Sequence, residues 1–104
     1  MKEHTIQPEG FWNNWLFGTV DGIAFEAKIC DIPSASGIDD GRVFKLIFYA
    51  SESDQEILVY ERGWEIYPAA EYEDTLNALL AFCAELPNAD EWKFRRGKKI
   101  IISC

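Results

Sequence analysis

The segment from residue 15 to residue 30 constrains the fold of this chain most, because it describes a β-hairpin around Asp21 and Gly22. An Asp-Gly pair between two apolar runs favours a two-residue turn in which both residues have a positive φ. In the second half of the segment, apolar residues alternate with Glu26 and Lys28. That alternation is typical of a strand with one buried face and one partly exposed face.

Four further segments continue the predicted sheet. Residues 42–50 are apolar on both faces, so we expect a central strand that is covered on both sides. Residues 56–62 predict the next strand, and residues 65–67 a short extended piece. Three consecutive isoleucines at 100–102 favour a closing strand, after a hairpin at residues 96–97.

One helix is predicted over residues 70–86, where apolar residues recur at steps of three and four and Pro87 follows as a stop signal. The whole pattern predicts a single α+β domain over residues 1–104. We expect an antiparallel sheet of four to six strands, a meander of hairpins, with the amphipathic helix packed on one face. The polar residues 1–10 are expected to form a loose lead-in.

Charge is distributed unevenly along the chain. All 18 Asp and Glu lie in residues 1–91 against five Lys and Arg, so this part carries a formal charge of −13. Residues 92–104 hold the other five Lys and Arg and no acid, which gives +5. An acidic body of this kind favours basic partners, whereas the basic end fits either counter-charge for the body or protection of an edge strand.

The sequence offers little for catalysis or for metal binding. Its only histidine, His4, falls in the segment expected to be loose, so no serine or cysteine is given a rigid base. The three cysteines lack metal-ligand spacing and are typical of reduced thiols in a cytoplasmic protein. No apolar run approaches the roughly 18 residues of a membrane span. We therefore expect a cytoplasmic protein that is not an enzyme and has no metal, no cofactor, no membrane contact and no direct nucleic-acid ligand.

Acidic residues at predicted loop tips and at the predicted helix start suggest a first binding surface. A rigid array of carboxylates can imitate a phosphate backbone and occupy the basic groove of a nucleic-acid-binding protein. The alternative is a solvated face without a partner. The candidate residues are Asp39, Asp40, Glu52, Asp54, Glu56, Glu71, Glu73 and Asp74.

A second candidate surface combines cations with an indole ring. If strands 42–50 and 56–62 pair as a hairpin, Arg42 and Arg62 approach each other across the ladder, with Lys45 and Trp64 nearby. Such a group would suit a nucleotide or another phosphorylated ligand. The alternative is that both arginines pair with neighbouring acids. The polar loop at residues 31–41, together with Arg42 and Lys45 just beyond it, is where we would look for a site first.

The middle of the chain resembles a known family. The stretches GTVDGIAFEAK at residues 18–28, PSASGIDDGRVFKL at residues 33–46 and YERGWE at residues 60–65 are similar to a family of short uncharacterised proteins. That family, a domain of unknown function, occurs largely in phages and prophages of Gram-positive bacteria. The resemblance covers about residues 15–80, and it departs from the family pattern at Phe44, where a serine is usual.

The resemblance brings no activity with it and implies a small accessory protein in a bacterial cytoplasm. Together with the acidic body, it favours a non-catalytic binding protein that inhibits a host factor, such as a CRISPR or other defence nuclease. The alternatives are a ligand-binding module that sequesters a nucleotide, and an enzyme of unknown type. The sequence leaves the partner, the strand order and the oligomeric state open.

Overall fold

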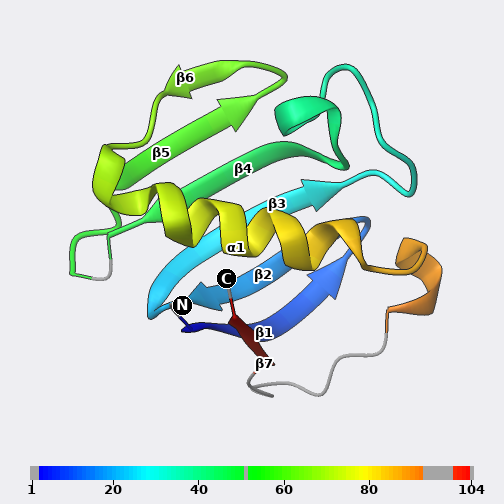
Figure 1. The fold of residues 1–104 in the computed structure, drawn as a ribbon, viewed down its shortest axis with the longest axis horizontal. Coiled ribbons are helices and arrows are strands. Elements are labelled where there is room, and N and C mark those ends of the chain that lie inside the picture. Colours follow the sequence, from blue (N-terminus) through cyan, green and yellow to red (C-terminus); the bar gives the residue numbers. More distant parts are fainter. Residues whose placement is uncertain (1–2, 51, 93–99, 104) are drawn as a thin grey trace.

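The computed structural model describes residues 3–50, 52–92 and, for the backbone alone, 100–103. Seven strands form one antiparallel sheet in the order β6-β5-β4-β3-β2-β1-β7, so that β1 to β6 are a meander and β7 pairs with the free edge of β1 (Figure 1). The strands are β1 (Glu3–Trp12), β2 (Trp15–Val20), β3 (Ile23–Ile29), β4 (Val43–Tyr49), β5 (Glu56–Glu61), β6 (Trp64–Ile66) and β7 (Ile100–Ser103). The predicted α+β fold is confirmed, and the sheet has one strand more than the predicted four to six, because β1 lies between β2 and β7.

Among the described residues, a single α-helix, α1 (Glu73–Ala84), crosses one face of the sheet (Figure 1). Three short 3-10 helices accompany it: η1 (Ile38–Asp40), η2 (Ala70–Tyr72) and η3 (Ala89–Glu91). The observed α-helix is therefore shorter than the helix predicted over residues 70–86. Residues 70–72 form the 3-10 helix η2 instead, and α1 ends at Ala84. Glu73 and Asp74 lie in its first turn, where carboxylates interact favourably with the helix dipole.

The core lies between α1 and the face of the sheet that the helix covers. From the helix, Leu76, Leu79 and Cys83 are buried against Phe25 and Phe48 of the central strands. Burial raises the pKa of the Cys83 thiol to about 12, and the nearby Arg42 guanidinium offsets this only in part. The thiol is therefore protonated at neutral pH and packs as a small apolar side chain.

The turn at Asp21 and Gly22 forms as predicted, with φ values of 52° and 79°. The same kind of turn occurs at Asn13 and Asn14, with φ values of 51° and 68°, and it joins β1 to β2. Asparagine tolerates this left-handed conformation better than most residues do. The chain therefore begins its meander one hairpin earlier than predicted.

The prediction that residues 1–10 are a loose lead-in is wrong for residues 3–10, which belong to β1. His4, Ile6 and Pro8 alternate as the buried residues of this strand. Pro8 is accommodated because the pairing of β1 with β2 shifts register between Pro8 and Gly10, which interrupts the ladder there. Gly18 permits the close approach of β2 to β1, since a Cβ atom at that position would lie 2.3 Å from the carbonyl oxygen of Gln7.

The strand predicted at residues 42–50 is central, but the expectation that both its faces are covered is wrong. The helix covers one face, whereas Ile47 and Tyr49 on the other face are only partly buried. The pairing of β3 with β4 shifts register at the start of β4, where Phe44 is the extra residue. Val43 joins the core, and Phe44 lies near Lys28, whose Nζ is 5.9 Å from the centre of the Phe44 ring.

Arg42, immediately before β4, connects the sheet to the end of the helix. Its side chain is buried, with 8% of the residue exposed, and its Nε donates a hydrogen bond to the Cys30 carbonyl at 2.8 Å. The two terminal nitrogens donate to carbonyl oxygens at and just beyond the end of α1. These acceptors are Cys83, Ala84, Leu86 and Pro87. The last turn of α1 contains no basic residue of its own, so Arg42 supplies the positive charge that its carbonyls favour.

We predict that Arg42→Lys destabilises the protein by about 2–4 kcal/mol, because a single ammonium nitrogen cannot bond both the Cys30 carbonyl and the carbonyls at the helix end, and it leaves some of them buried and unpaired. The measurement is the urea midpoint of unfolding. Lys45→Gln is the matched control on the same strand. Lys45 makes an exposed ion pair with Glu61, with Nζ and Oε1 3.2 Å apart, and its loss should cost less than about 1 kcal/mol. Equal effects of the two substitutions would contradict the role given to Arg42.

Candidate functional site

Six of the eight predicted carboxylates lie at one end of the molecule, where the β4–β5 connection meets the start of the helix. We call this surface the acidic end; it consists of Glu52, Asp54, Glu56, Glu71, Glu73 and Asp74. All six residues are exposed. They come from two segments that are distant in sequence but adjacent in the fold, at the left of Figure 1.

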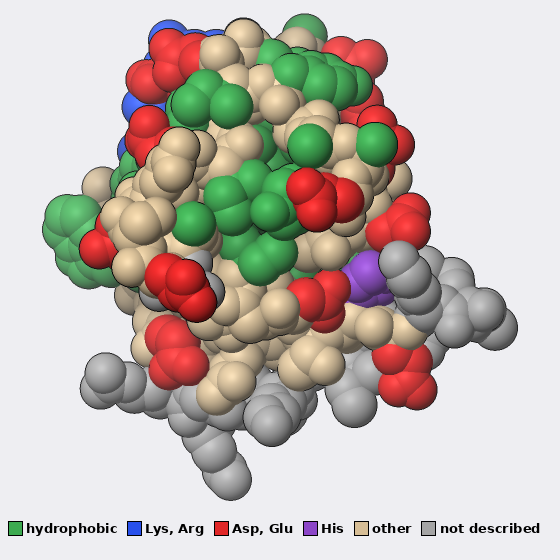
Figure 2. Space-filling view, turned by 90° about the vertical axis from the view of Figure 1, so that its left-hand side faces the viewer, with side chains coloured by type: hydrophobic (Ala, Val, Ile, Leu, Met, Phe, Trp, Pro, Cys, Tyr) green, Lys and Arg blue, Asp and Glu red, His purple; other side chains and the backbone are tan. Residues whose placement is uncertain are grey.

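The acidic end has an apolar centre. A hollow of about 370 Å³, the end hollow, lies between the start of β3, the β4–β5 connection and η2. Figure 2 shows hydrophobic side chains in the middle of this end of the molecule and carboxylates around them. The described residues that line the hollow are Ile23, Ala50, Glu52, Ser53, Ile57 and Tyr72.

The carboxylates produce a measurable electrostatic effect on a neighbouring tyrosine. Partial burial raises the pKa of the Tyr49 hydroxyl, and the negative charges of Glu26, Glu56 and Asp54 raise it further. Tyr49 also donates a hydrogen bond to Glu26, with Oη and Oε2 3.3 Å apart. The potential at this end of the sheet is therefore negative.

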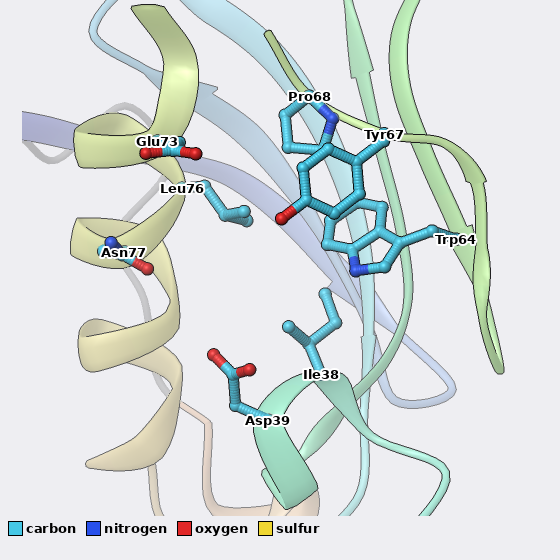
Figure 3. Close-up of a pocket in the computed structure, with 8 residues that line it drawn as sticks. All are labelled: Ile38, Asp39, Trp64, Tyr67, Pro68, Glu73, Leu76 and Asn77. Atoms are coloured by element: carbon cyan, nitrogen blue, oxygen red, sulfur yellow. The ribbon is translucent and has the colours of Figure 1, made fainter. Parts of the chain in front are cut away.

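Asp39 and Asp40 lie in η1, apart from the acidic end. Both have left-handed backbone conformations, with φ values of 53° and 56°. Asp39 and Glu73 face one cavity of about 190 Å³, which we call the helix-side pocket (Figure 3). Its lining residues are Ile38, Asp39, Trp64, Tyr67, Pro68, Glu73, Leu76 and Asn77. Glu73 belongs to the acidic end and also lines this pocket, so the pocket that Asp39 lines adjoins the acidic end.

The four residues of the predicted phosphate site are not brought together. The guanidinium of Arg42 bonds the carbonyls at the end of the helix, and Lys45 pairs with Glu61 on the opposite face of the sheet. Arg62 lies opposite Phe44 rather than Arg42, since its backbone N–H donates to the Phe44 carbonyl at 3.1 Å. The alternative of acidic partners for both arginines is also wrong for Arg42, whose acceptors are backbone carbonyls.

The loop at residues 31–41 is more ordered than its composition suggests. Backbone hydrogen bonds close it on itself, including Ser34 N–H to the Gly41 carbonyl at 2.9 Å. Ile38 is buried in the core, and Tyr60 Oη donates to the Ser36 carbonyl at 2.9 Å. Packing and backbone hydrogen bonds therefore explain the conformation of most of this loop. Asp39 is its polar side chain that lines a cavity.

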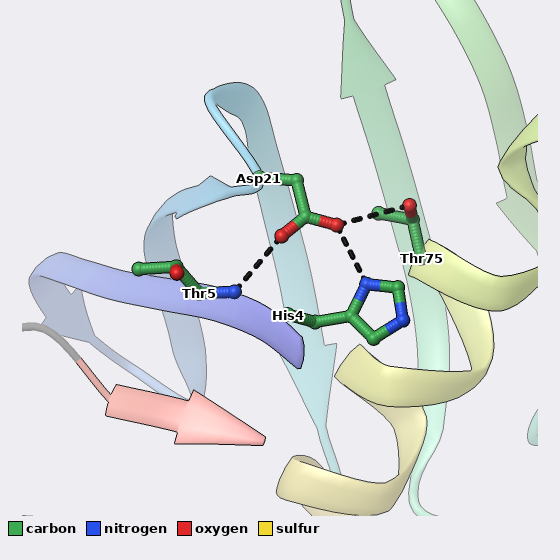
Figure 4. Close-up of polar contacts among 4 residues, drawn as sticks. All are labelled: His4, Thr5, Asp21 and Thr75. Atoms are coloured by element: carbon green, nitrogen blue, oxygen red, sulfur yellow. Dashed lines mark hydrogen bonds and ion pairs between the residues drawn. The ribbon is translucent and has the colours of Figure 1, made fainter. Parts of the chain in front are cut away.

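A partly buried polar cluster that sequence reasoning missed lies where β1, the Asp21 turn and α1 meet (Figure 4). His4 is only 3% exposed, and its Nδ1 donates to Asp21 Oδ2 at 2.7 Å. Thr75 Oγ1 donates to the same oxygen at 3.2 Å, and Thr5 N–H donates to Asp21 Oδ1 at 2.8 Å. The expectation of a mobile histidine is therefore wrong, because β1 is ordered and Asp21 fixes the orientation of the ring.

This histidine and aspartate pair resembles the orienting half of a catalytic triad, but its free nitrogen is enclosed. His4 Nε2 is buried and has no hydrogen-bond partner among the residues that the structure describes. No described serine or cysteine is bonded to it, and a substrate cannot reach it in this conformation. The cluster joins the first strand to the first helical turns.

The described residues offer neither a metal centre nor a membrane-spanning helix. Within residues 3–50 and 52–92, no group of three His, Cys, Asp or Glu side chains is arranged to hold a metal ion. None of the described helices is long and apolar enough to cross a membrane. Trp92 belongs to the core, with 4% exposed, while the remainder of the basic segment at residues 93–99 lies outside the described residues.

We predict that Asp21→Asn destabilises the protein in a pH-dependent way. Partial burial by itself raises the pKa of the Asp21 carboxyl, but the bonds from His4, Thr5 and Thr75 lower it below its ordinary value of 3.8. The ionised carboxylate therefore stabilises the folded state above that pH, and the contribution is lost as the pH falls through the lowered pKa. The stability difference from the wild type should be about 1 kcal/mol at neutral pH and should vanish in acid.

The control for this experiment is Asp54→Asn, which makes the same chemical change at another exposed turn residue with a positive φ. Asp54 accepts no side-chain hydrogen bond from the described part of the chain, so its substitution should alter stability by less than about 0.5 kcal/mol at every pH. Thermal unfolding between acid and neutral pH measures both variants. A pH-independent difference for Asp21→Asn would show that the carboxylate charge is unimportant.

Comparison with known proteins gives one match. The profile of a family described as a domain of unknown function, DUF7678, matches residues 14–84, which run from the β1–β2 turn to the last residue of α1. No curated protein and no solved structure matches the chain significantly. Because the matched residues are more than half of the chain and contain both cavities described above, the protein belongs to the DUF7678 family.

Proposed function

We propose that this protein is a non-catalytic binding protein that holds a basic surface of another protein against its acidic end. The observation that carries the proposal is the apolar end hollow surrounded by exposed carboxylates (Figure 2). An apolar centre within a polar rim is the usual anatomy of a protein–protein interface. The sign of the rim charge selects basic partners and increases the rate at which they associate.

Three of the four described Lys and Arg residues lie away from this end. Arg42 is buried at the opposite end of the helix, and Lys45 is paired with Glu61 on the uncovered face of the sheet. Lys28 lies on that same face, with its Nζ 5.6 Å from the centre of the Trp15 ring. Among the described Lys and Arg, none makes an ion pair with Glu52, Asp54 or Glu56, so these carboxylates can attract a basic partner.

The chemistry favours a partner that binds nucleic acids. Such proteins present basic surfaces, and much of their affinity comes from neutralising phosphate charge. Carboxylates on a rigid frame can occupy the same surface and exclude the nucleic acid. The resemblance to phage and prophage proteins suggests a host defence factor, such as a CRISPR or other defence nuclease, as the partner inside the bacterial cell.

The test is a pull-down from bacterial lysate with two variants of equal net charge. The first carries Glu52→Gln, Asp54→Asn, Glu56→Gln and Glu71→Gln. The second carries Glu9→Gln, Glu65→Gln, Glu85→Gln and Glu91→Gln, all exposed and outside the acidic end. We expect the wild type and the second variant to retain a nucleic-acid-binding protein, and the first variant to lose it.

Retention should decrease with salt, because the carboxylates are exposed and their interactions are screened. In a plaque assay, phage should be protected by the wild type and not by the first variant. Equal retention by both variants would assign binding to another surface. No retained protein, together with no protection of phage, would refute the proposed function.

A further inference from the structure

The helix-side pocket combines two kinds of groups that proteins use together for organic cations. Two aromatic rings, Trp64 and Tyr67, form one wall, with ring centres 5.2 Å apart and planes at 61°. The carboxylates of Asp39 and Glu73 approach from η1 and from α1, and Leu76 lies at the back (Figure 3). Aromatic faces attract cations, and carboxylates form charge-assisted hydrogen bonds with them.

Neither carboxylate is neutralised by the described part of the chain. Asp39 and Glu73 are both exposed, and neither makes an ion pair with a described Lys or Arg. Both negative charges line one small cavity, so each would attract a cation that is bound there. The pocket therefore has the charge and the lining of a cation site.

Packing anchors two residues of the pocket wall, Ile38 and Trp64. Ile38, the residue before Asp39, is anchored in the core, and Gly41 N–H donates to its carbonyl at 2.9 Å. On the other wall, the Trp64 ring packs against Tyr60, with ring centres 5.0 Å apart. A site built on such anchored residues requires little ordering when a ligand binds.

We propose that this pocket takes the guanidinium of an arginine side chain from the basic protein partner. This inference rests on the proposed function for the origin of the arginine. A planar guanidinium can stack on an indole and at the same time donate two parallel hydrogen bonds to a carboxylate, which a compact ammonium group does less well. The volume of about 190 Å³ is below the roughly 300–1,000 Å³ of pockets that enclose whole small-molecule ligands, and it suits one side chain.

The test is an NMR titration of the ¹⁵N-labelled full chain with N-acetyl-arginine methylamide, followed at the indole N–H of Trp64. We expect a saturable shift of that resonance and of the Asn77 amide, and weaker binding of the corresponding lysine compound. Asp39→Asn with Glu73→Gln should weaken arginine binding by about tenfold or more, as expected for the loss of charge-assisted hydrogen bonds. Glu52→Gln with Glu56→Gln is the matched control and should change it less than about twofold, since these residues lie outside the pocket.

The outcomes separate this inference from the proposed function. An absent shift, or a shift that is unchanged by the Asp39 and Glu73 substitutions, overturns the arginine pocket. The same pair of substitutions should also weaken retention of the partner in the pull-down. Full retention would overturn the pocket as the anchor and leave the acidic end as the binding surface, whereas arginine binding with no retained partner would support the pocket and refute the proposed function.

Discussion

The hydrogen bonds from Arg42 to the end of α1 set the position of the helix, and the surfaces proposed to bind depend on that position. A helix ends with carbonyl groups that lack partners within the helix. Here the buried guanidinium of Arg42, the residue before β4, bonds several of these carbonyls. It also bonds the carbonyl of Cys30, the residue after β3. With this end of the helix fixed on the sheet, its first turn places Glu73 between the end hollow and the helix-side pocket.

The same arrangement explains why the acidity of the chain is concentrated. One helix covers one face of the sheet, so cations of the central strands are used for structure or lie on the far face. Arg42 illustrates the first case and Lys45 the second. Glu52, Asp54 and Glu56 at the β4–β5 connection make no ion pair with a described Lys or Arg, and carboxylates of this end surround apolar side chains that the helix leaves uncovered.

Local patterns in the sequence predicted the elements whose signals lie within a few residues. The Asp21 turn and the apolar spacing of α1 are of this kind, and both are present in the structure. The first strand was missed because Pro8 is uncommon in paired strands, although the Asn13-Asn14 turn was a readable signal for a hairpin. The role of Arg42 could not be predicted, because its acceptors include backbone carbonyls more than 40 residues away that no side-chain pattern reveals. For the same reason the helix-side pocket could not be predicted, since Asp39 and Glu73 line one cavity only after the helix has packed on the sheet.

The central claim is that the acidic end, and not the uncovered face of the sheet, binds basic partners. The most direct measurement is a chemical-shift map of the ¹⁵N-labelled protein on addition of an oligo-arginine peptide, at low and at high salt. If the acidic end binds the peptide, the largest shifts occur at residues 52–57 and 71–77, and they diminish at high salt. Shifts concentrated at Trp15 and Phe17, on the uncovered face, would contradict it.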